Sequence, residues 1–174
     1  MNEIAPWLHE RLPPDRDLNE AELVQLAVEV SQERRFWGHL VHHDPNTRYF
    51  HQLYRDPHLD VWLICWLNAQ DTGYHDHDLS SGAVYVVEGF LCEDYFHRDE
   101  DGWIREKTRE HPAGSLLQFD AAYIHGLRHP GGPPAISIHV YSPALWRMGH
   151  YEPDDGGAVR RVSITYADEL STSA

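Results

Sequence analysis

The sequence contains few cysteines and no long apolar segment. Its two cysteines, Cys65 and Cys92, are too few for a scaffold held together by disulfide bonds. Cys65 lies in the apolar run 61–66, which predicts a buried free thiol and a reducing, cytoplasmic environment. No segment approaches the roughly 20 apolar residues of a membrane-spanning helix, and residues 1–7 lack the basic and apolar regions of a signal peptide. We therefore expect no membrane partner.

Basic residues are also scarce. The 174 residues include 14 Lys+Arg against 28 Asp+Glu, a formal net charge of −14, and Lys107 is the only lysine. A field of this sign repels phosphate backbones, so we expect no nucleic-acid partner. Histidine, by contrast, is abundant, with 14 residues. Because imidazole is the commonest metal ligand in proteins, this enrichment favours a metal site without locating it.

The pattern of apolar residues divides the chain into a helical segment, residues 1–45, and a β-rich segment, residues 46–170, which together fit one domain. Prolines predict an irregular start. A capping-box pattern over 17–20, followed by apolar residues at helical spacing, predicts a helix over 18–36 that packs on the β-structure. Short β-rich runs between turn residues predict strands over 47–54, 60–67, 73–77, 83–90, 91–97, 103–109, 115–119, 122–128, 135–142 and 159–165. Many short strands at this spacing are typical of an all-β barrel or sandwich.

The segment 73–77 is the first candidate for chemistry. Side chains two residues apart in a strand point to the same face, so His75 and His77 are able to bind one metal ion together. The pattern is short, and the alternative is chance in a histidine-rich chain. His125 lies in a second segment that precedes a Pro/Gly turn, and it is a candidate third ligand from a distant strand. The alternative for His125 is a core histidine.

A third segment, 135–143, alternates polar and apolar residues. Ser137, His139 and Tyr141 share one face of the predicted strand. In a barrel interior these polar groups need hydrogen-bond partners, and a chain from Ser137 through His139 to Tyr141 satisfies them and presents a phenol to the cavity. The alternative is that this face is exposed to solvent.

The first two segments resemble the two sequence motifs of cupins, a class of small jelly-roll β-barrels. The first motif closes at Gly89, and the second contains Pro-Ala-Gly at 112–114. The glutamate ligand usual in the first motif is absent, since residues 80–82 are Ser-Ser-Gly, and His129 stands where the second motif has asparagine. The resemblance implies a cupin barrel with the N-terminal helix packed on it.

Without the glutamate, the motifs leave a three-histidine site, and residues 46–152 resemble the cysteine dioxygenase family. The Ser-x-His-x-Tyr-Ser-Pro run of the third segment is similar to a run in that family. The resemblance implies an Fe(II) cofactor and six site residues: the metal ligands His75, His77 and His125, and the catalytic residues Tyr141, His139 and Ser137. It implies that O2 is added to the sulfur of a small thiol, L-cysteine or a relative such as 3-mercaptopropionate, to give a sulfinic acid. We expect a monomer or a small homo-oligomer.

The same family binds the substrate carboxylate with an arginine or a glutamine on an early strand. The resemblance points to Gln52, with Arg48 on the same strand face, and regular alternation places Arg55 on the other face. Gly82 stands where some members carry a cysteine that crosslinks to the active-site tyrosine. Tyr141 is therefore expected without a thioether bond.

Two other functions are consistent with these motifs. One is a cupin dioxygenase that acts on a different small molecule. The other is a non-catalytic cupin that binds a small molecule, and it predicts the loss of at least one metal ligand. We expect the histidines outside the motifs on the surface or in loops: His9, His39, His42, His43, His58, His97 and His111.

Overall fold

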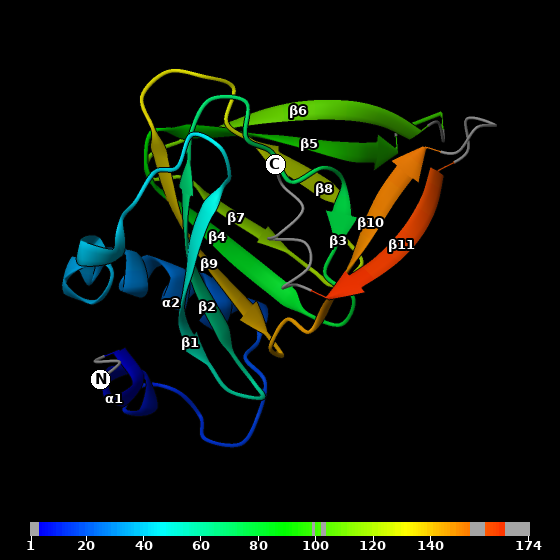
Figure 1. The fold of residues 1–174 in the computed structure, drawn as a ribbon. Helices are drawn as coiled ribbons and strands as arrows, with labels where there is room; N and C mark the ends of the chain where they lie inside the picture. The colour runs from blue at the N-terminus through cyan, green and yellow to red at the C-terminus, as the bar shows by residue number, and fades with distance from the viewer. Residues whose placement is uncertain (1–3, 99, 102–103, 154–158, 166–174) are drawn as a thin grey trace.

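The computed structural model describes residues 4–98, 100–101, 104–153 and 159–165, and it confirms the predicted all-β fold with an N-terminal helix (Figure 1). Residues 166–170 of the predicted β-rich segment lie outside the described residues. The α-helices are α1 (Ile4–His9) and α2 (Glu20–Gln32), followed by 3-10 turns at Arg34–Phe36 and Gly38–Leu40. The strands are β1 (Tyr49–Arg55), β2 (Asp60–Trp66), β3 (His75–Asp76), β4 (Ser81–Glu88), β5 (Phe90–Arg98), β6 (Ile104–Pro112), β7 (Leu116–Phe119), β8 (His125–Arg128), β9 (Ala135–Ser142), β10 (Arg147–Pro153) and β11 (Val159–Thr165).

The strands form two sheets that enclose a common interior (Figure 1). The order is β1-β2-β9-β4-β7 in the five-stranded sheet and β11-β10-β3-β8-β5-β6 in the six-stranded sheet. Side chains from both sheets pack in one cluster, which includes Trp62 and Val84 from the first sheet and Leu91 and Leu127 from the second. This topology makes β3 and β8 neighbours, although they lie far apart in the chain.

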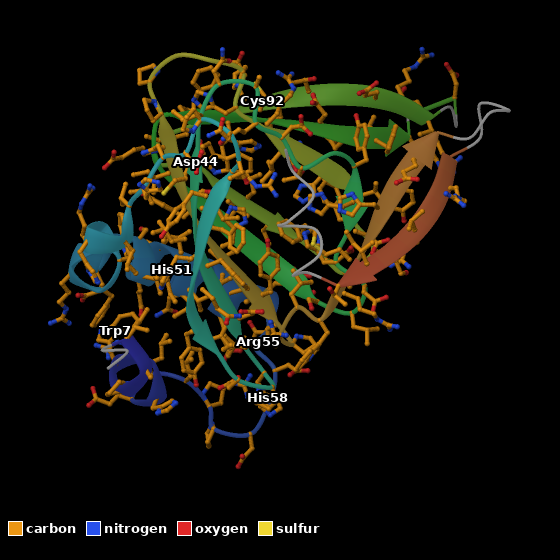
Figure 2. The ribbon with its side chains drawn as sticks, in the orientation of Figure 1. Trp7, Asp44, His51, Arg55, His58 and Cys92 are labelled. Atoms are coloured by element: carbon orange, nitrogen blue, oxygen red, sulfur yellow. The ribbon has the colours of Figure 1, made fainter. Side chains whose placement is uncertain are left out.

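Helix α2 covers the outer face of the five-stranded sheet and packs on β4 and β9 (Figure 1). Its inward face is buried as predicted, at Leu23, Leu26, Ala27 and Val30. The predicted start is wrong by two residues: Asn19 is the N-cap and exchanges capping-box hydrogen bonds with Glu22. Asp17 instead contacts the ring of His58, which lies in the turn between β1 and β2 (Figure 2). No helix among the described residues is long and apolar enough to cross a membrane.

Strand β2 is buried along its whole length because both of its faces are covered. Residues such as Leu63 and Cys65 pack beneath the helices, whereas Trp62 and Ile64 face the interior between the sheets. Cys65 is buried and free, as predicted. A continuous apolar strand of this kind is the signature of an element covered on both sides.

Two elements differ from the sequence prediction. Residues 4–9 form helix α1 rather than irregular chain, because Pro6 falls in the first turn, where its missing N–H costs nothing. Ile4 and Leu8 of that helix are buried. Strand β10 was not predicted, since its sequence, Arg-Met-Gly-His-Tyr-Glu-Pro, has little apolar content. It forms because it pairs with β3 on one side and β11 on the other.

Candidate metal centre

Three histidine side chains converge in the interior of the barrel. His75 and His125 are register partners on the adjacent strands β3 and β8, and His77 follows β3 directly. The exposed fractions are 3% for His75, 0% for His77 and 1% for His125. One ligand nitrogen from each ring lies within 4.8 Å of the others. The structure therefore brings the three predicted ligands together.

Hydrogen bonds fix which nitrogen two of the rings turn toward this centre. The Nδ1–H of His75 donates to the Gly73 carbonyl (3.1 Å), and the Nδ1–H of His125 donates to the Glu93 carboxylate (3.0 Å). Carbonyl and carboxylate oxygens only accept, so Nε2 of both rings is the unprotonated, ligating nitrogen. Neither ring nitrogen of His77 has a hydrogen-bond partner within the described part of the chain. A metal ion would satisfy this buried ring, so these residues fit a metal.

Burial also sets the protonation state of His75 and His77. Burial, and after it the neighbouring imidazoles, lower the pKa of His75 and His77 well below the usual histidine value. The rings are therefore neutral, which is the form that binds a metal. The cluster contains no carboxylate among the described residues. A divalent cation held by three neutral ligands keeps its full charge.

A buried carboxylate, Glu93, orients one of the ligands. It accepts a hydrogen bond from His111 Nε2–H (2.9 Å) as well as the one from His125. Burial by itself raises the pKa of Glu93. The hydrogen bonds from the two histidines outweigh burial and bring the pKa down to about 2. The ionised carboxylate holds the His125 ring in place, as groups behind metal ligands generally do. Sequence patterns gave no sign of this contact.

The prediction for the histidines outside the motifs is wrong at His111, which is 5% exposed. It is buried because its ring pairs with Glu93. The other six are exposed or partly exposed, as predicted: His9, His39, His42, His43, His58 and His97.

The polar face of β9 points into the interior and forms the predicted hydrogen-bonded chain. Ser137 Oγ lies 2.8 Å from His139 Nε2, and His139 Nδ1 lies 3.1 Å from the Tyr141 hydroxyl. Trp66 Nε1–H donates to Ser137 Oγ (2.9 Å) and extends the chain by one residue. All of these side chains are buried, so the solvent-exposed alternative for this face is wrong. Burial, and then the nearby Arg48 charge, lower the pKa of His139 to about 3, which keeps this ring neutral.

A small cavity lies between this chain and the histidine cluster. Its volume is about 20 Å³, which is the room of a single water molecule. Its polar lining comes from Arg48, Thr72, His139 and Tyr141, next to His75 and His125 of the cluster, and the rest of its wall is apolar. A molecule larger than water fits this cavity only if lining side chains move.

The two predicted substrate-binding residues lie in different surroundings. Arg48 is 2% exposed, lines the cavity, stacks over the Trp66 ring at 5.1 Å and donates to the Asp71 carbonyl. Gln52 does not line the cavity, and its amide donates to the Asp60 carboxylate at 2.9 Å. The geometry therefore brings Arg48, but not Gln52, to the histidine cluster.

The prediction that Arg55 lies on the opposite strand face from Gln52 is wrong. The register of β1 against β2 shifts between Gln52 and Tyr54, so an extra residue is inserted there. Such a bulge reverses the alternation of side chains beyond it. Arg55 consequently pairs with Asp60 (2.8 Å), the same carboxylate that Gln52 contacts. Burial raises the pKa of Asp60 to about 6 despite these contacts.

Gly82 makes room for an aromatic ring beside the cluster. A Cβ atom at this position would lie 2.4 Å from Phe119 and 3.0 Å from the Tyr141 ring. Phe119 in turn stacks on the His77 ring, with centroids 4.3 Å apart and an angle of 17° between the planes. The absence of a side chain at position 82 thus lets Phe119 lie where it stacks on His77, a predicted metal ligand.

Gly82→Ala is expected to destabilise the protein by about 1–3 kcal/mol, because an added methyl group overpacks this site. Urea unfolding of the metal-free protein measures the change. The double variant Gly82→Ala/Phe119→Leu should recover much of the loss, since the smaller side chain frees the space. Equal stability of the single variant and the wild type would contradict the packing described here.

A fourth histidine, His150, lies beside the cluster and was not identified from the sequence. It is the register partner of His75 on β10, and the two ring centroids are 6.1 Å apart. Its Nε2 atom is buried without a hydrogen-bond partner among the described residues. Because β10 was not predicted, no sequence signal placed this ring near the site.

The two facing sheets and the buried histidine cluster define a cupin with a candidate metal centre. The family model for cysteine dioxygenase type I matches residues 10–153, and the chain belongs to this family. It is therefore an oxygenase-type enzyme of the cupin fold. The prediction of the family from the sequence motifs is confirmed.

Two solved structures are similar to this chain. A protein from Bacillus halodurans has a TM-score of 0.50 at 18% identity, over 86% of this chain and 91% of that one. A Klebsiella pneumoniae protein with a double-stranded β-helix domain has a TM-score of 0.46 at 15% identity, over 72% of this chain and 92% of that one. At these identities the likeness concerns the fold alone.

Proposed function

We propose that this protein is an Fe(II)-dependent thiol dioxygenase that converts a small thiol carboxylate, such as L-cysteine or 3-mercaptopropionate, into the sulfinic acid. The main observation in support is the buried three-histidine cluster, which has no carboxylate among the described residues and of which His75 and His125 line a small cavity together with Arg48 and Tyr141. Membership in the cysteine dioxygenase type I family agrees with this reaction.

In this proposal His75, His77 and His125 hold the iron. Bound there, Fe(II) would supply positive charge that favours the thiolate form of the substrate and electrons for the reaction with O2. Neutral imidazole ligands would leave the positive charge of the ion undiminished, whereas a carboxylate ligand would reduce it. The apolar part of the cavity wall, including Phe119 and Met148, excludes bulk water from the reacting groups.

The hydrogen-bonded chain on β9 sets the direction in which Tyr141 donates. Trp66 can only donate, so Ser137 accepts from it and is free to donate to Nε2 of His139. Nδ1 of the neutral His139 ring then carries the proton and donates to the Tyr141 oxygen. The Tyr141 oxygen therefore accepts from His139, and in our proposal the Tyr141 O–H would donate to the substrate carboxylate or to the reacting oxygen once a substrate is bound.

Arg48 is the group that we assign to the substrate carboxylate. A guanidinium group matches a carboxylate with two parallel hydrogen bonds, whereas a glutamine amide offers a neutral dipole. Arg48 lines the cavity and is held against the Trp66 ring. Gln52 is engaged by Asp60, so we propose an indirect role for it, in fixing the end of β1.

Arg48→Met is expected to lower kcat/KM for thiol carboxylates by about 10–100-fold, the usual effect of losing a charged hydrogen bond. Gln52→Ala, four residues further along the chain on β1, is the matched variant and should change kcat/KM by a few-fold at most. An oxygen electrode measures uptake by the iron-loaded protein with L-cysteine, 3-mercaptopropionate and cysteamine. Cysteamine has no carboxylate, so its turnover should be low and insensitive to Arg48→Met.

The opposite pattern would contradict the arginine assignment. If Gln52→Ala lowers kcat/KM and Arg48→Met leaves it unchanged, then Gln52 binds the carboxylate. Equal turnover of cysteamine and 3-mercaptopropionate would mean that the site does not recognise a carboxylate at all.

A further inference from the structure

The strand that carries two of the predicted ligands has little pairing of its own. Strand β3 is two residues long, and it is joined to its neighbours at the register pairs His75↔His125, His75↔His150 and Asp76↔Gly149. Such a short strand fixes its side chains weakly by backbone pairing alone. The orientation of His75 and His77 therefore depends on what holds the residue between them.

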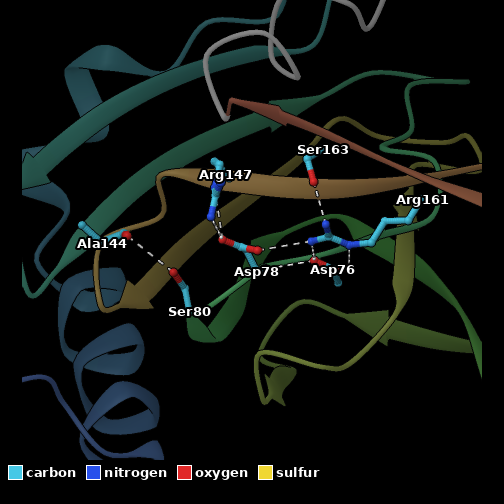
Figure 3. Close-up of polar contacts among 7 residues, drawn as sticks. All are labelled: Asp76, Asp78, Ser80, Ala144, Arg147, Arg161 and Ser163. Atoms are coloured by element: carbon cyan, nitrogen blue, oxygen red, sulfur yellow. Dashed lines mark hydrogen bonds and ion pairs between the residues drawn. The ribbon is translucent and has the colours of Figure 1, made fainter.

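That residue, Asp76, is held by the C-terminal hairpin (Figure 3). Its carboxylate accepts two hydrogen bonds from Arg161, from Nε at 2.6 Å and from Nη2 at 2.7 Å. A third comes from the Tyr151 hydroxyl at 2.7 Å. Asp76 also accepts from the backbone N–H of Asp78 (2.9 Å). Side chains alternate along a strand, so these contacts lie on the side of β3 opposite to His75.

The Arg161 side chain reaches Asp76 by crossing an intervening strand. Arg161 lies on β11, and β10 separates that strand from β3. The crossing point is Gly149, where a Cβ atom would lie 2.2 Å from Arg161 Nε. Ser163, the partner of Gly149 on β11, accepts from Arg161 Nη1 at 2.6 Å and fixes its direction. A glycine in β10 thus provides the space for this contact.

The residue after His77 is tied to the same hairpin (Figure 3). Asp78 contacts Arg147 of β10 at 3.0 Å and Arg161 at 3.4 Å. Consequently each of the two acidic residues that flank His77 is bound to at least one arginine of the β10–β11 hairpin. The sequence His-Asp-His-Asp therefore points alternately to the cluster and to the hairpin.

An exposed ion pair contributes little to stability, and this is the plainest alternative for Arg161. Two observations argue for more. The Asp76 side chain is 8% exposed, and Arg161 contacts it through two hydrogen bonds in a fixed fork. By comparison, the neighbouring Arg160–Glu152 pair has side chains that are 70% and 58% exposed and a single contact at 3.4 Å.

We propose that Arg161 is a positioning residue that, through Asp76, holds His75 and His77 in their metal-binding orientation. This inference rests on the proposed metal site. Since coupling between two events is reciprocal, metal binding should also stabilise the docking of the β10–β11 hairpin on β3.

The affinity for Co(II), used as the metal alone, tests this role. Arg161→Met is expected to weaken Co(II) binding by about 10–100-fold, the usual effect of removing a group behind a metal ligand. Arg160→Met, on the same strand, is the matched control and should leave the affinity unchanged. Arg161→Lys keeps the charge without the fork and should recover part of the loss. In the double variant Arg161→Met/Asp76→Asn the two effects should be less than additive.

Equal Co(II) affinity of Arg161→Met and Arg160→Met would overturn the proposal. A wild-type protein that binds no Co(II) would instead overturn the metal site on which it rests. Hydrogen exchange of the wild type with and without Co(II) serves as a second test that needs no variant. The β10–β11 amides should exchange more slowly with the metal bound, and an unchanged rate would contradict the coupling.

Discussion

His77→Ala is expected to abolish stoichiometric metal binding and, with it, oxygen uptake. The ring of His77 is fully buried, and neither of its nitrogens has a hydrogen-bond partner among the described residues. Two remaining imidazoles hold a divalent ion much more weakly than three, and the cluster offers no carboxylate from the described residues as a replacement. We expect the same loss for His75→Ala and His125→Ala. Metal content after anaerobic iron loading and desalting measures it.

His97→Ala is the matched control, since His97 is exposed on β5. Its metal content should equal that of the wild type. Circular dichroism should show that each variant retains the β-fold, because the strand pairing and the apolar side chains between the two sheets remain. A His77→Ala protein that keeps a full equivalent of iron would remove His77 from the ligand set.

Tyr141→Phe is expected to lower kcat by about 100-fold while iron content stays unchanged. The phenol lies at the end of the chain Ser137–His139–Tyr141 and lines the cavity. A hydrogen bond aimed at reacting groups affects kcat when it is stronger in the transition state than in the ground state. The ring itself is kept, so its packing beside Phe119 is preserved. Steady-state oxygen uptake and product yield together measure kcat and the coupling of O2 use to product.

Tyr85→Phe is the control for this substitution, because Tyr85 packs in the cluster beneath the helices rather than in the cavity. It should leave kcat unchanged. If Tyr141→Phe also keeps the wild-type kcat, the role of Tyr141 is limited to packing.

The residues that bind or face the site were largely predictable where alternation alone determines their direction. The i, i+2 spacing of His75 and His77, and of Ser137, His139 and Tyr141, gives the shared face that the structure has. Alternation alone does not distinguish a buried polar face from an exposed one, and the structure shows that Ser137, His139 and Tyr141 are buried.

Prediction failed where a contact between distant strands overrides the local pattern. The bulge between Gln52 and Tyr54 reverses the side on which Arg55 lies, and no residue type in that segment marks it. His111 is buried because Glu93 reaches it from the neighbouring strand. In both cases the local sequence gives no sign of the residues on the neighbouring strand that decide where the side chain lies.

The C-terminal hairpin shows the same limit. Strand β10 has few apolar residues, and it pairs with β3 beside a contact between Arg161 and Asp76, which lie 85 residues apart in the chain. Helix α1 differs from the prediction for another reason: proline is typical of irregular chain, but it is well tolerated in a first helical turn, where Pro6 lies.

The proposed reaction is tested most directly by turnover of the iron-loaded protein with 3-mercaptopropionate or L-cysteine under isotopically labelled 18O2. Mass spectrometry of the product then counts the labelled oxygen atoms. A thiol dioxygenase places both atoms of one O2 on sulfur, so we predict a sulfinic acid that carries two labels. A product with one label or none, or oxygen uptake without any sulfinic acid, would contradict the proposal.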